Sequence, residues 1–299
     1  MTLVPAAGHL LHMPAHIFFQ TGEYEDLAVT NEHAVRADED YMERAGTLGV
    51  YPLMFYTHNL HFIAVGRAAQ GRYEEAKAAA DRLAAFAGPR VKEMQMEECF
   101  AAMPLVIQLR MQRWDEILAT AAPDSTWLTA NALWHFARGT AFAAKGEVQD
   151  ANRERALFEA ARKLVPPSAL YVNGNNSAEN VLKVAAIVLE ARLATDPIHA
   201  VPLWRRAVQA QDGLTYDEPP PWYYPIRESL GAALLRAGQP AEAEAAFRED
   251  LKSHRRNGRS LFGLMESLKT QKKSTDAEWV RKEFEAAWKG DSLRLEDLD

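Results

Sequence analysis

Histidine placement is the feature of this sequence with the clearest chemical potential. Five of the nine histidines fall in two short stretches, with His9, His12 and His16 in the first and His58 and His61 in the second. A helix that carries His12 and His16 four residues apart presents both rings on one face. A pair of this kind is a recognised way of offering two nitrogens to one transition-metal ion.

The two stretches hold equivalent places relative to the turn glycines that follow them. Counted back from that glycine, the first histidine of each stretch stands thirteen residues away and the next stands ten residues away. Neighbouring helices pack at ~8–10 Å, so the imidazoles can converge. One hypothesis is therefore a zinc-type divalent metal ion, and three ligands with an open position would suit a metal-dependent enzyme. The candidate ligands are His9, His12, His16, His58 and His61.

A second interpretation needs no metal, because histidines also hydrogen-bond between helices or to buried carbonyl groups. Pro14 stands between His12 and His16, and an interior proline either starts or kinks a helix. If the helix starts at Pro14, then His9 and His12 precede it and the stripe is less regular. Spacing alone leaves both interpretations open.

An internal repeat predicts the elements that position these histidines. Seven segments share a turn residue that is followed, five positions later, by a small or compact residue. Compact side chains at that place let two helices approach to ~8–10 Å. The turn positions are Gly22, Gly71, Gln112, Gly146, Thr195, Gly238 and Lys272, and the compact residues are Leu27, Ala76, Ile117, Ala151, Ala200, Ala243 and Ala277.

The repeat resembles the tetratricopeptide-repeat (TPR) family. Leu230, Gly231, Gly238, Ala243 and Phe247 match the family consensus best, and two of the six turn-to-turn spacings equal its period of 34 residues. HEAT and armadillo units, which lack a fixed turn glycine, fit less well. The resemblance implies an all-α, right-handed TPR-like α-solenoid of about seven helix pairs, whose first helices line a concave groove. The repeats are expected in one domain over residues 1–299, near 8–38, 54–87, 97–121, 128–164, 177–211, 223–254 and 258–289, with insertions near 39–53, 165–180 and 211–225.

Further polar and aromatic residues are predicted to contact a ligand in that groove. Glu228, for example, stands ten residues before its turn glycine, the place that His12 and His61 take in their own repeats. Ordinary packing or hydrogen bonding between helices is the alternative for each of them. The candidates are Tyr56, Asn59, Trp134, His135, Arg138, Trp222, Tyr223 and Glu228.

Bulk composition narrows the classes of partner. The formal net charge of −7 argues against a nucleic-acid partner, which needs a basic face. No run of 18 apolar residues is present, so no membrane-spanning helix is expected. Cys99 is the single cysteine, which favours a reducing, cytoplasmic setting. Apolar residues near the N-terminus precede any capping element, so we expect either further upstream repeats or a partner that covers this end.

These features lead to two functional expectations. The first is a binding module that recognises a peptide, a protein or a small ligand on its concave face, without a nucleic-acid or membrane partner. The alternative is a metal-binding protein or metal-dependent enzyme whose histidine-rich site lies in the first two repeats. The sequence contains no phosphate-binding glycine loop, nucleophile elbow or paired CxxC motif, so whether it is an enzyme stays open.

Overall fold

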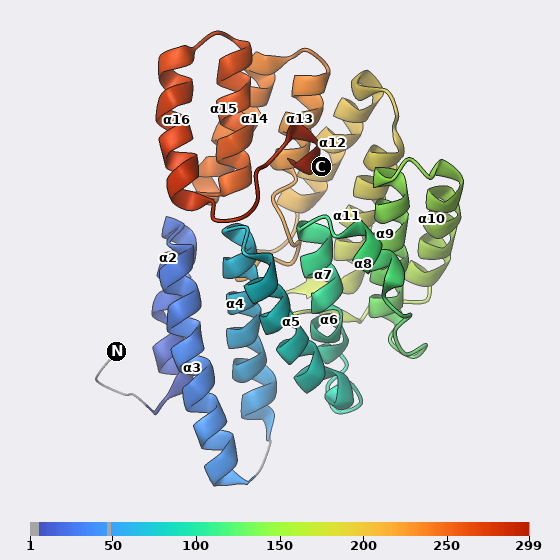
Figure 1. Cartoon of the computed structure of the whole chain (residues 1–299). Coiled ribbons are helices and arrows are strands. Elements are labelled where there is room, and N and C mark those ends of the chain that lie inside the picture. Colours follow the sequence, from blue (N-terminus) through green and yellow to red (C-terminus); the bar gives the residue numbers. More distant parts are fainter. Residues whose placement is uncertain (1–5, 47–48, 299) are drawn as a thin grey trace.

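The chain folds almost wholly into α-helices (Figure 1), in a computed structural model that describes residues 6–46 and 49–298. Within those residues, the strands are limited to β1 (Leu170–Tyr171) and β2 (Asn176–Ser177), which form a short antiparallel hairpin. The predicted all-α class is confirmed.

Consecutive helices pack against each other along the chain. The first helix of the N-terminal pair is broken into two pieces, and α3 continues beyond the predicted end of its repeat at residue 38. Three short helical turns, η1 (Pro52–Tyr56), η2 (Gly88–Arg90) and η3 (Leu295–Leu298), supplement the pairs. The pairs are α1 (Gly8–His12) and α2 (Pro14–Thr21) with α3 (Tyr24–Ala45), α4 (Thr57–Ala69) with α5 (Tyr73–Ala87), α6 (Glu97–Ala101) and α7 (Met103–Arg110) with α8 (Trp114–Ala119), α9 (Leu128–Ala144) with α10 (Val148–Arg162), α11 (Ala178–Leu193) with α12 (Pro197–Asp212), α13 (Arg227–Arg236) with α14 (Pro240–Ser253), and α15 (Gly258–Thr270) with α16 (Ser274–Ala287).

The predicted turn positions lie between the helices of each pair, and most share one backbone geometry. At six of them φ is positive, between 56° and 82°, and the amide of the next residue donates to the carbonyl five residues earlier. Glu23 N, for example, lies 2.8 Å from Phe18 O. This is the Schellman cap, in which glycine accepts the left-handed conformation without a steric penalty. At the seventh turn, the Asp196 carboxylate instead caps α12 by accepting the amide of Ile198 at 2.9 Å.

Close helix packing in the C-terminal half depends on two glycines that face one aromatic ring. Phe247 of α14 is fully buried between α13 and α15. A Cβ atom added at Gly231 would lie 2.3 Å from Phe247 Cζ, and one added at Gly263 would lie 2.2 Å from the same atom. These distances leave no room for a methyl group on either helix.

Gly263→Ala is therefore expected to destabilise the protein by about 1–3 kcal/mol, the usual range for overpacking a core. Urea denaturation measures the effect. Gly213→Ala is the matched control, because its φ is negative and a Cβ atom there makes only ordinary contacts at 3.5 Å. Adding Phe247→Leu to Gly263→Ala should restore part of the loss. Equal stability of the Gly263→Ala and Gly213→Ala variants would contradict this account of the packing.

The stack of pairs curves until its last pair meets its first two. Figure 1 shows the C-terminal end of α16 beside the ends of α2 and α4. The amide of Lys289 donates to Gln70 O at 2.8 Å, and the Trp288 ring packs against Gly71 in the turn between α4 and α5. The chain then crosses the inner side of the last pairs, where Ser229 Oγ donates to Leu298 O at 3.0 Å.

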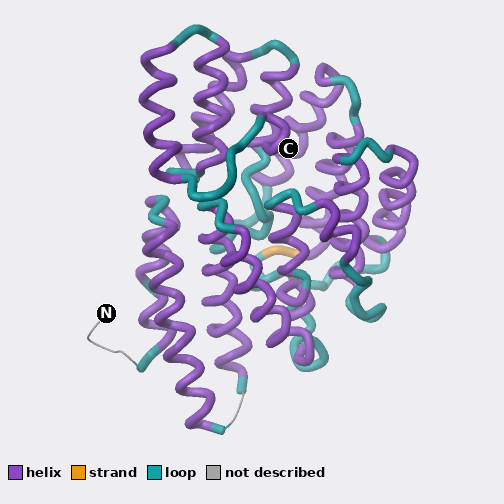
Figure 2. The backbone as a smooth tube through the Cα atoms, viewed as in Figure 1, coloured by secondary structure: helices purple, strands orange, loops and turns teal. Residues whose placement is uncertain are grey.

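Two predicted insertions fill the interior that this curvature creates. Figure 2 shows the β1–β2 hairpin near the centre of the molecule with helices around it. The connection between α12 and α13 lies beside it, since the Asn176 side chain accepts the Thr215 amide at 2.8 Å and donates to Thr215 O at 2.9 Å. The concave side is therefore occupied by the protein's own insertions.

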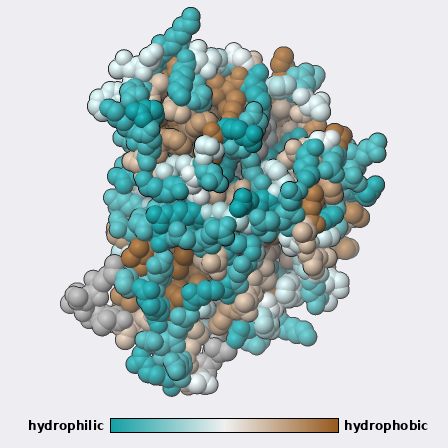
Figure 3. Space-filling view, in the orientation of Figure 1, coloured by the Kyte–Doolittle hydropathy of each residue, from teal (hydrophilic) through white to brown (hydrophobic). Residues whose placement is uncertain are grey.

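The face of the molecule drawn in Figure 3 is largely hydrophilic, with apolar side chains visible in smaller patches, as expected for helices that bury one side. Across the described part of the chain, every helix is too short or too polar to cross a bilayer.

Candidate metal centre

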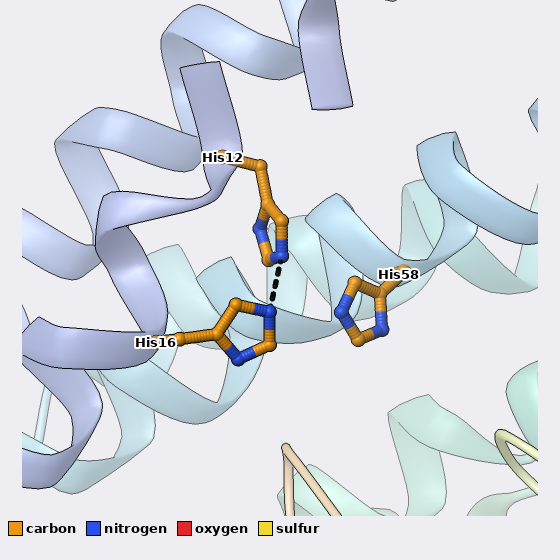
Figure 4. A group of neighbouring side chains, drawn as sticks. All are labelled: His12, His16 and His58. Carbon is orange, nitrogen blue, oxygen red and sulfur yellow. Dashed lines mark hydrogen bonds between the residues drawn. The ribbon is translucent and has the colours of Figure 1, made fainter. Parts of the chain in front are cut away.

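Three of the predicted histidines meet in one place. His12 comes from α1, His16 from α2 and His58 from α4, and one ring nitrogen of each lies within 4.8 Å of the others. Figure 4 shows the rings pointing toward a common centre. Nε2 of His12 and Nε2 of His16 are 2.9 Å apart.

The break between α1 and α2 does not disturb the spacing of the first two histidines. Pro14, which has no amide hydrogen, begins α2. Met13 nevertheless keeps helical angles, with φ −49° and ψ −38°. His12 and His16 therefore stay one turn apart on the same side, as their four-residue spacing predicts.

Asn31 determines which nitrogen of His12 carries the proton. The Asn31 amide group donates from Nδ2 to Leu27 O at 2.8 Å, so its Oδ1 atom faces the histidine and can only accept. His12 Nδ1, at 2.7 Å, must be the protonated nitrogen. The lone pair of the neutral ring is then on Nε2, which points at His16.

A carboxylate from a distant part of the sequence holds His16 in the matching orientation. Glu218, in the connection between α12 and α13, accepts a hydrogen bond from His16 Nδ1. It also accepts from Gln20 and Tyr216. Burial raises the pKa of Glu218, but the hydrogen bonds from these three side chains outweigh that effect and the net pKa is lowered. An ionised Glu218 fixes the proton of His16 on Nδ1 and leaves the Nε2 lone pair free in the neutral ring.

The hairpin between α10 and α11 supports the third histidine. His58 is hydrogen-bonded to the side chain of Asn173, whose Nδ2 atom donates to Asp217 Oδ1 at 2.7 Å and to Glu218 O at 3.2 Å. Asn173 Oδ1 therefore accepts from His58. Each of the three imidazoles thus has a hydrogen-bond acceptor behind it, which is how metal-binding histidines are oriented.

Burial keeps the His12 and His58 imidazoles neutral near pH 7. It lowers the pKa of His12 to about 4, helped by the neighbouring His16 and His9 and opposed by the hydrogen bond to Asn31. Burial, followed by the nearby His12, His61 and His16, lowers the pKa of His58 to about 2. A neutral imidazole is the form that binds a metal ion.

The spacing of the rings matches one ion bound by three imidazoles. Two nitrogens at ~2.0–2.1 Å from a tetrahedral ion lie about 3.3 Å apart, and the ring centroids lie about 5 Å apart. The observed centroid distances are 4.7 Å for His12–His16, 4.8 Å for His12–His58 and 5.9 Å for His16–His58. A cavity of about 340 Å³ adjoins His16 and His58, and its wall includes Asn175 and Asp217.

The two remaining histidines of the stripe lie outside this group of three. His9 lines the same cavity, but its ring packs on Phe55 at 4.3 Å and lies 5.8 Å from His12. His61 lies one turn further along α4, where its ring contacts that of Phe100, with centroids 5.6 Å apart. His61 therefore belongs to a central cavity described below and not to the candidate metal centre.

Three predicted groove residues form a separate network between repeats. Glu154 of α10 accepts from His135 Nδ1 and from Arg138 Nε, each at 2.7 Å. The Arg138 guanidinium lies 4.8 Å from the Trp134 ring, and Trp134 Nε1 donates to Thr120 O at 3.0 Å. These contacts fit the alternative of hydrogen bonding between helices.

The other candidates occupy four different surroundings. Tyr56 donates to Glu39 at 3.0 Å, and Asn59 donates to Asp38 at 2.8 Å. Glu228 is fully buried in an ion pair with Arg110. Trp222 and Tyr223 line the central cavity together with His61.

Sequence analysis did not identify the residues that orient the histidines. Asn31, Gln20, Tyr216, Asp217 and Glu218 have no metal-ligand spacing, and their positions follow from tertiary packing. The only signal was indirect, because Tyr216, Asp217 and Glu218 lie in a stretch that had been recognised as an insertion. Neither a comparison with protein-family models nor one with curated proteins found a match to this chain. A functional assignment therefore rests on the site itself.

Proposed function

We propose that this protein binds a divalent transition-metal ion of the zinc type through His12, His16 and His58. The observation that carries the proposal is that one ring nitrogen of each of these histidines lies within 4.8 Å of the others, with Nε2 of His12 and Nε2 of His16 facing each other 2.9 Å apart. When both rings are neutral, Asn31 and Glu218 hold their protons on Nδ1, and the two facing Nε2 lone pairs repel unless a cation lies between them. A metal ion that is also bound by His58 would remove the repulsion and use all three rings.

Such an ion would have a position left for a further ligand. Three protein ligands and an open fourth position are typical of catalytic zinc sites, whereas structural sites are closed by four protein ligands. The adjoining cavity gives that position access to a small molecule. A metal-dependent enzyme is thus compatible with the site, and the ion would supply Lewis-acid polarisation of a bound oxygen.

We further propose that the scaffold is a right-handed, TPR-like solenoid that works in the cytoplasm. The pairing of adjacent helices and the shared turn geometry at six predicted positions support the repeat assignment. As a binding module, it suits a small ligand better than a peptide or a protein partner. The insertions that occupy the concave side leave pockets of small-molecule size there.

The metal content of purified protein tests the proposal. After dialysis against zinc and then against buffer, the wild type is expected to retain about one ion per chain by elemental analysis. His12→Ala, His16→Ala and His58→Ala should each lose it. Glu218→Gln should weaken zinc affinity by about 10- to 100-fold in a chelator competition, because it removes the carboxylate behind His16. Zinc at 100 times its dissociation constant should add about 2.7 kcal/mol to the free energy of unfolding.

His199→Ala is the matched control, since its side chain is 80% exposed on α12, away from the three histidines. His61→Phe should likewise leave metal content unchanged. A folded wild-type protein that takes up no zinc would contradict the proposal, as would uptake that survives His12→Ala and His58→Ala together.

A further inference from the structure

The interior contains a second cavity, which α4 borders through His61, one turn along the helix from the metal-site residue His58. It encloses about 70 Å³, room for about five to seven water-sized positions. The metal-site residue His58 and the cavity residue His61 are neighbours on this helix. Its wall includes aromatic side chains from four parts of the chain, namely Phe19, Tyr24, Tyr171, Trp222, Tyr223 and Tyr224.

Three residues that line this cavity each have a buried polar atom without a hydrogen-bond partner among the described residues. The atoms are Nδ1 of His61, Nε1 of Trp222 and the hydroxyl of Tyr223. His61 and Trp222 are only 3% and 2% exposed. A buried polar group without a partner costs about 1–3 kcal/mol, so three around one cavity indicate that something else completes their hydrogen bonds.

The other polar residues of the wall already have hydrogen-bond partners. His254 Nδ1 contacts Asp250 Oδ1 at 2.7 Å, and Asn257 donates to Glu228 at 2.7 Å. Gln211 donates from Nε2 to Tyr224 O at 2.8 Å. The charge of Arg110 is matched by Glu228, with atoms 2.5 Å and 2.9 Å apart.

The cavity is therefore suited to an uncharged ligand. Burial lowers the pKa of His61 to about 3, so its ring is neutral at pH 7. Burial likewise raises the pKa of Tyr223, which keeps its hydroxyl protonated. An anion or a cation would bring an unmatched charge into an aromatic enclosure, which is strongly unfavourable.

We propose that this cavity binds a small uncharged single-ring molecule that carries a hydroxyl group, of the phenol class. The ring would pack among the aromatic side chains, and its oxygen would accept the Trp222 Nε1–H. The ligand's hydroxyl group would donate its hydrogen to His61 Nδ1 or to the hydroxyl oxygen of Tyr223. A single ring with one hydroxyl is a small ligand, as a cavity of about 70 Å³ requires.

A short proline-rich wall separates the cavity from an open cleft of about 430 Å³. The residues that line both spaces are Phe19, Gln211, Pro220, Pro221, Trp222 and His254. This wall lies between the cavity and the cleft, and Trp222, the proposed hydrogen-bond donor, is part of it.

Calorimetric titration of the full chain with phenol tests the proposal, with toluene as the apolar analogue and benzoate as the anionic one. EDTA is present throughout, so that the result does not depend on the metal proposal. We expect one phenol per chain with a dissociation constant below about 1 mM, weaker binding of toluene, and no binding of benzoate. Trp222→Phe, which keeps a ring but removes the donor, should weaken phenol about tenfold and leave toluene unchanged.

Val106→Phe, on the cavity wall, should abolish binding of both ring compounds, whereas Val148→Phe on the exposed side of α10 should not. Val106→Phe also risks overpacking the core, so Trp222→Phe is interpreted independently of it. The proposal is overturned if the wild type binds no phenol at 10 mM. It is equally overturned if benzoate binds as well as phenol, or if Trp222→Phe leaves the phenol affinity unchanged.

Discussion

Glu228→Gln is expected to lower the free energy of unfolding by about 3–5 kcal/mol, the usual result of removing one partner of a buried ion pair. Glu228 is fully buried and accepts two hydrogen bonds from Arg110, which joins α13 to α7 across the interior. Without the carboxylate, Arg110 keeps a buried charge with no partner of its own. Arg259 is also buried nearby, and its pKa is already lowered to about 9 by burial and by Arg110.

Denaturant unfolding at pH 7 measures this loss, and Asp212→Asn provides the control. Asp212 makes a similar two-bond pair with Arg227, at 2.7 Å for each bond, but its side chain is 48% exposed. Its loss should cost no more than about 1 kcal/mol. Replacing both buried partners, as Glu228→Leu with Arg110→Met, should recover most of the stability. Similar losses for Glu228→Gln and Asp212→Asn would show that the buried ion pair contributes no more to the free energy of unfolding than the exposed one.

Glu97→Gln is expected to have the opposite effect and to stabilise the protein at pH 8. Glu97 is fully buried on α6, and neither of its carboxylate oxygens has a hydrogen-bond partner among the described residues. Burial raises its pKa to about 7, and the attraction of Arg90 offsets only part of that shift. A glutamine has the same size and carries no charge to desolvate.

The sign of the pH dependence follows from this raised pKa. Between about pH 4.5 and pH 7 the folded protein holds a proton on Glu97 that the unfolded chain has released, so the free energy of unfolding falls as the pH rises. The raised pKa of Glu97 corresponds to a loss of about 3 kcal/mol in the free energy of unfolding by pH 8. Glu97→Gln should remove this loss at pH 8 and change little at pH 4.5.

Urea unfolding of both proteins at pH 4.5 and pH 8 measures the difference, with the exposed Glu93→Gln variant as control. Glu98 beside it also has a pKa raised by burial, and it contributes equally to the wild type and to both variants. The same pH slope in the wild type and in Glu97→Gln would rule out an ionisable Glu97 as its source.

The sequence alone determined the helical class and the positions of the turns. A compact residue five places after each turn is a local requirement for two helices to pack, so it repeats visibly along the chain. Glycine at a left-handed cap is equally local, and four of the six caps carry it. Gln112 and Lys272 take the same conformation without glycine, and they were located only through the repeat.

The candidate site was only partly determined in this way. The four-residue spacing predicted that His12 and His16 lie together, because the period of a helix depends only on its local geometry. The same reasoning grouped His58 with His61, yet three residues turn a helix by about 300°, which leaves the two rings about 60° apart. Which of them faces His12 depended on how α4 packs against α1 and α2.

The tertiary structure decided what surrounds the histidines. Glu218 reaches His16 across 202 residues of sequence, and Asn173 reaches His58 from another insertion. No periodic pattern links such segments, because curvature of the whole stack brings them together. The interior cavity has the same origin, since it exists only where the closed stack and its two insertions meet.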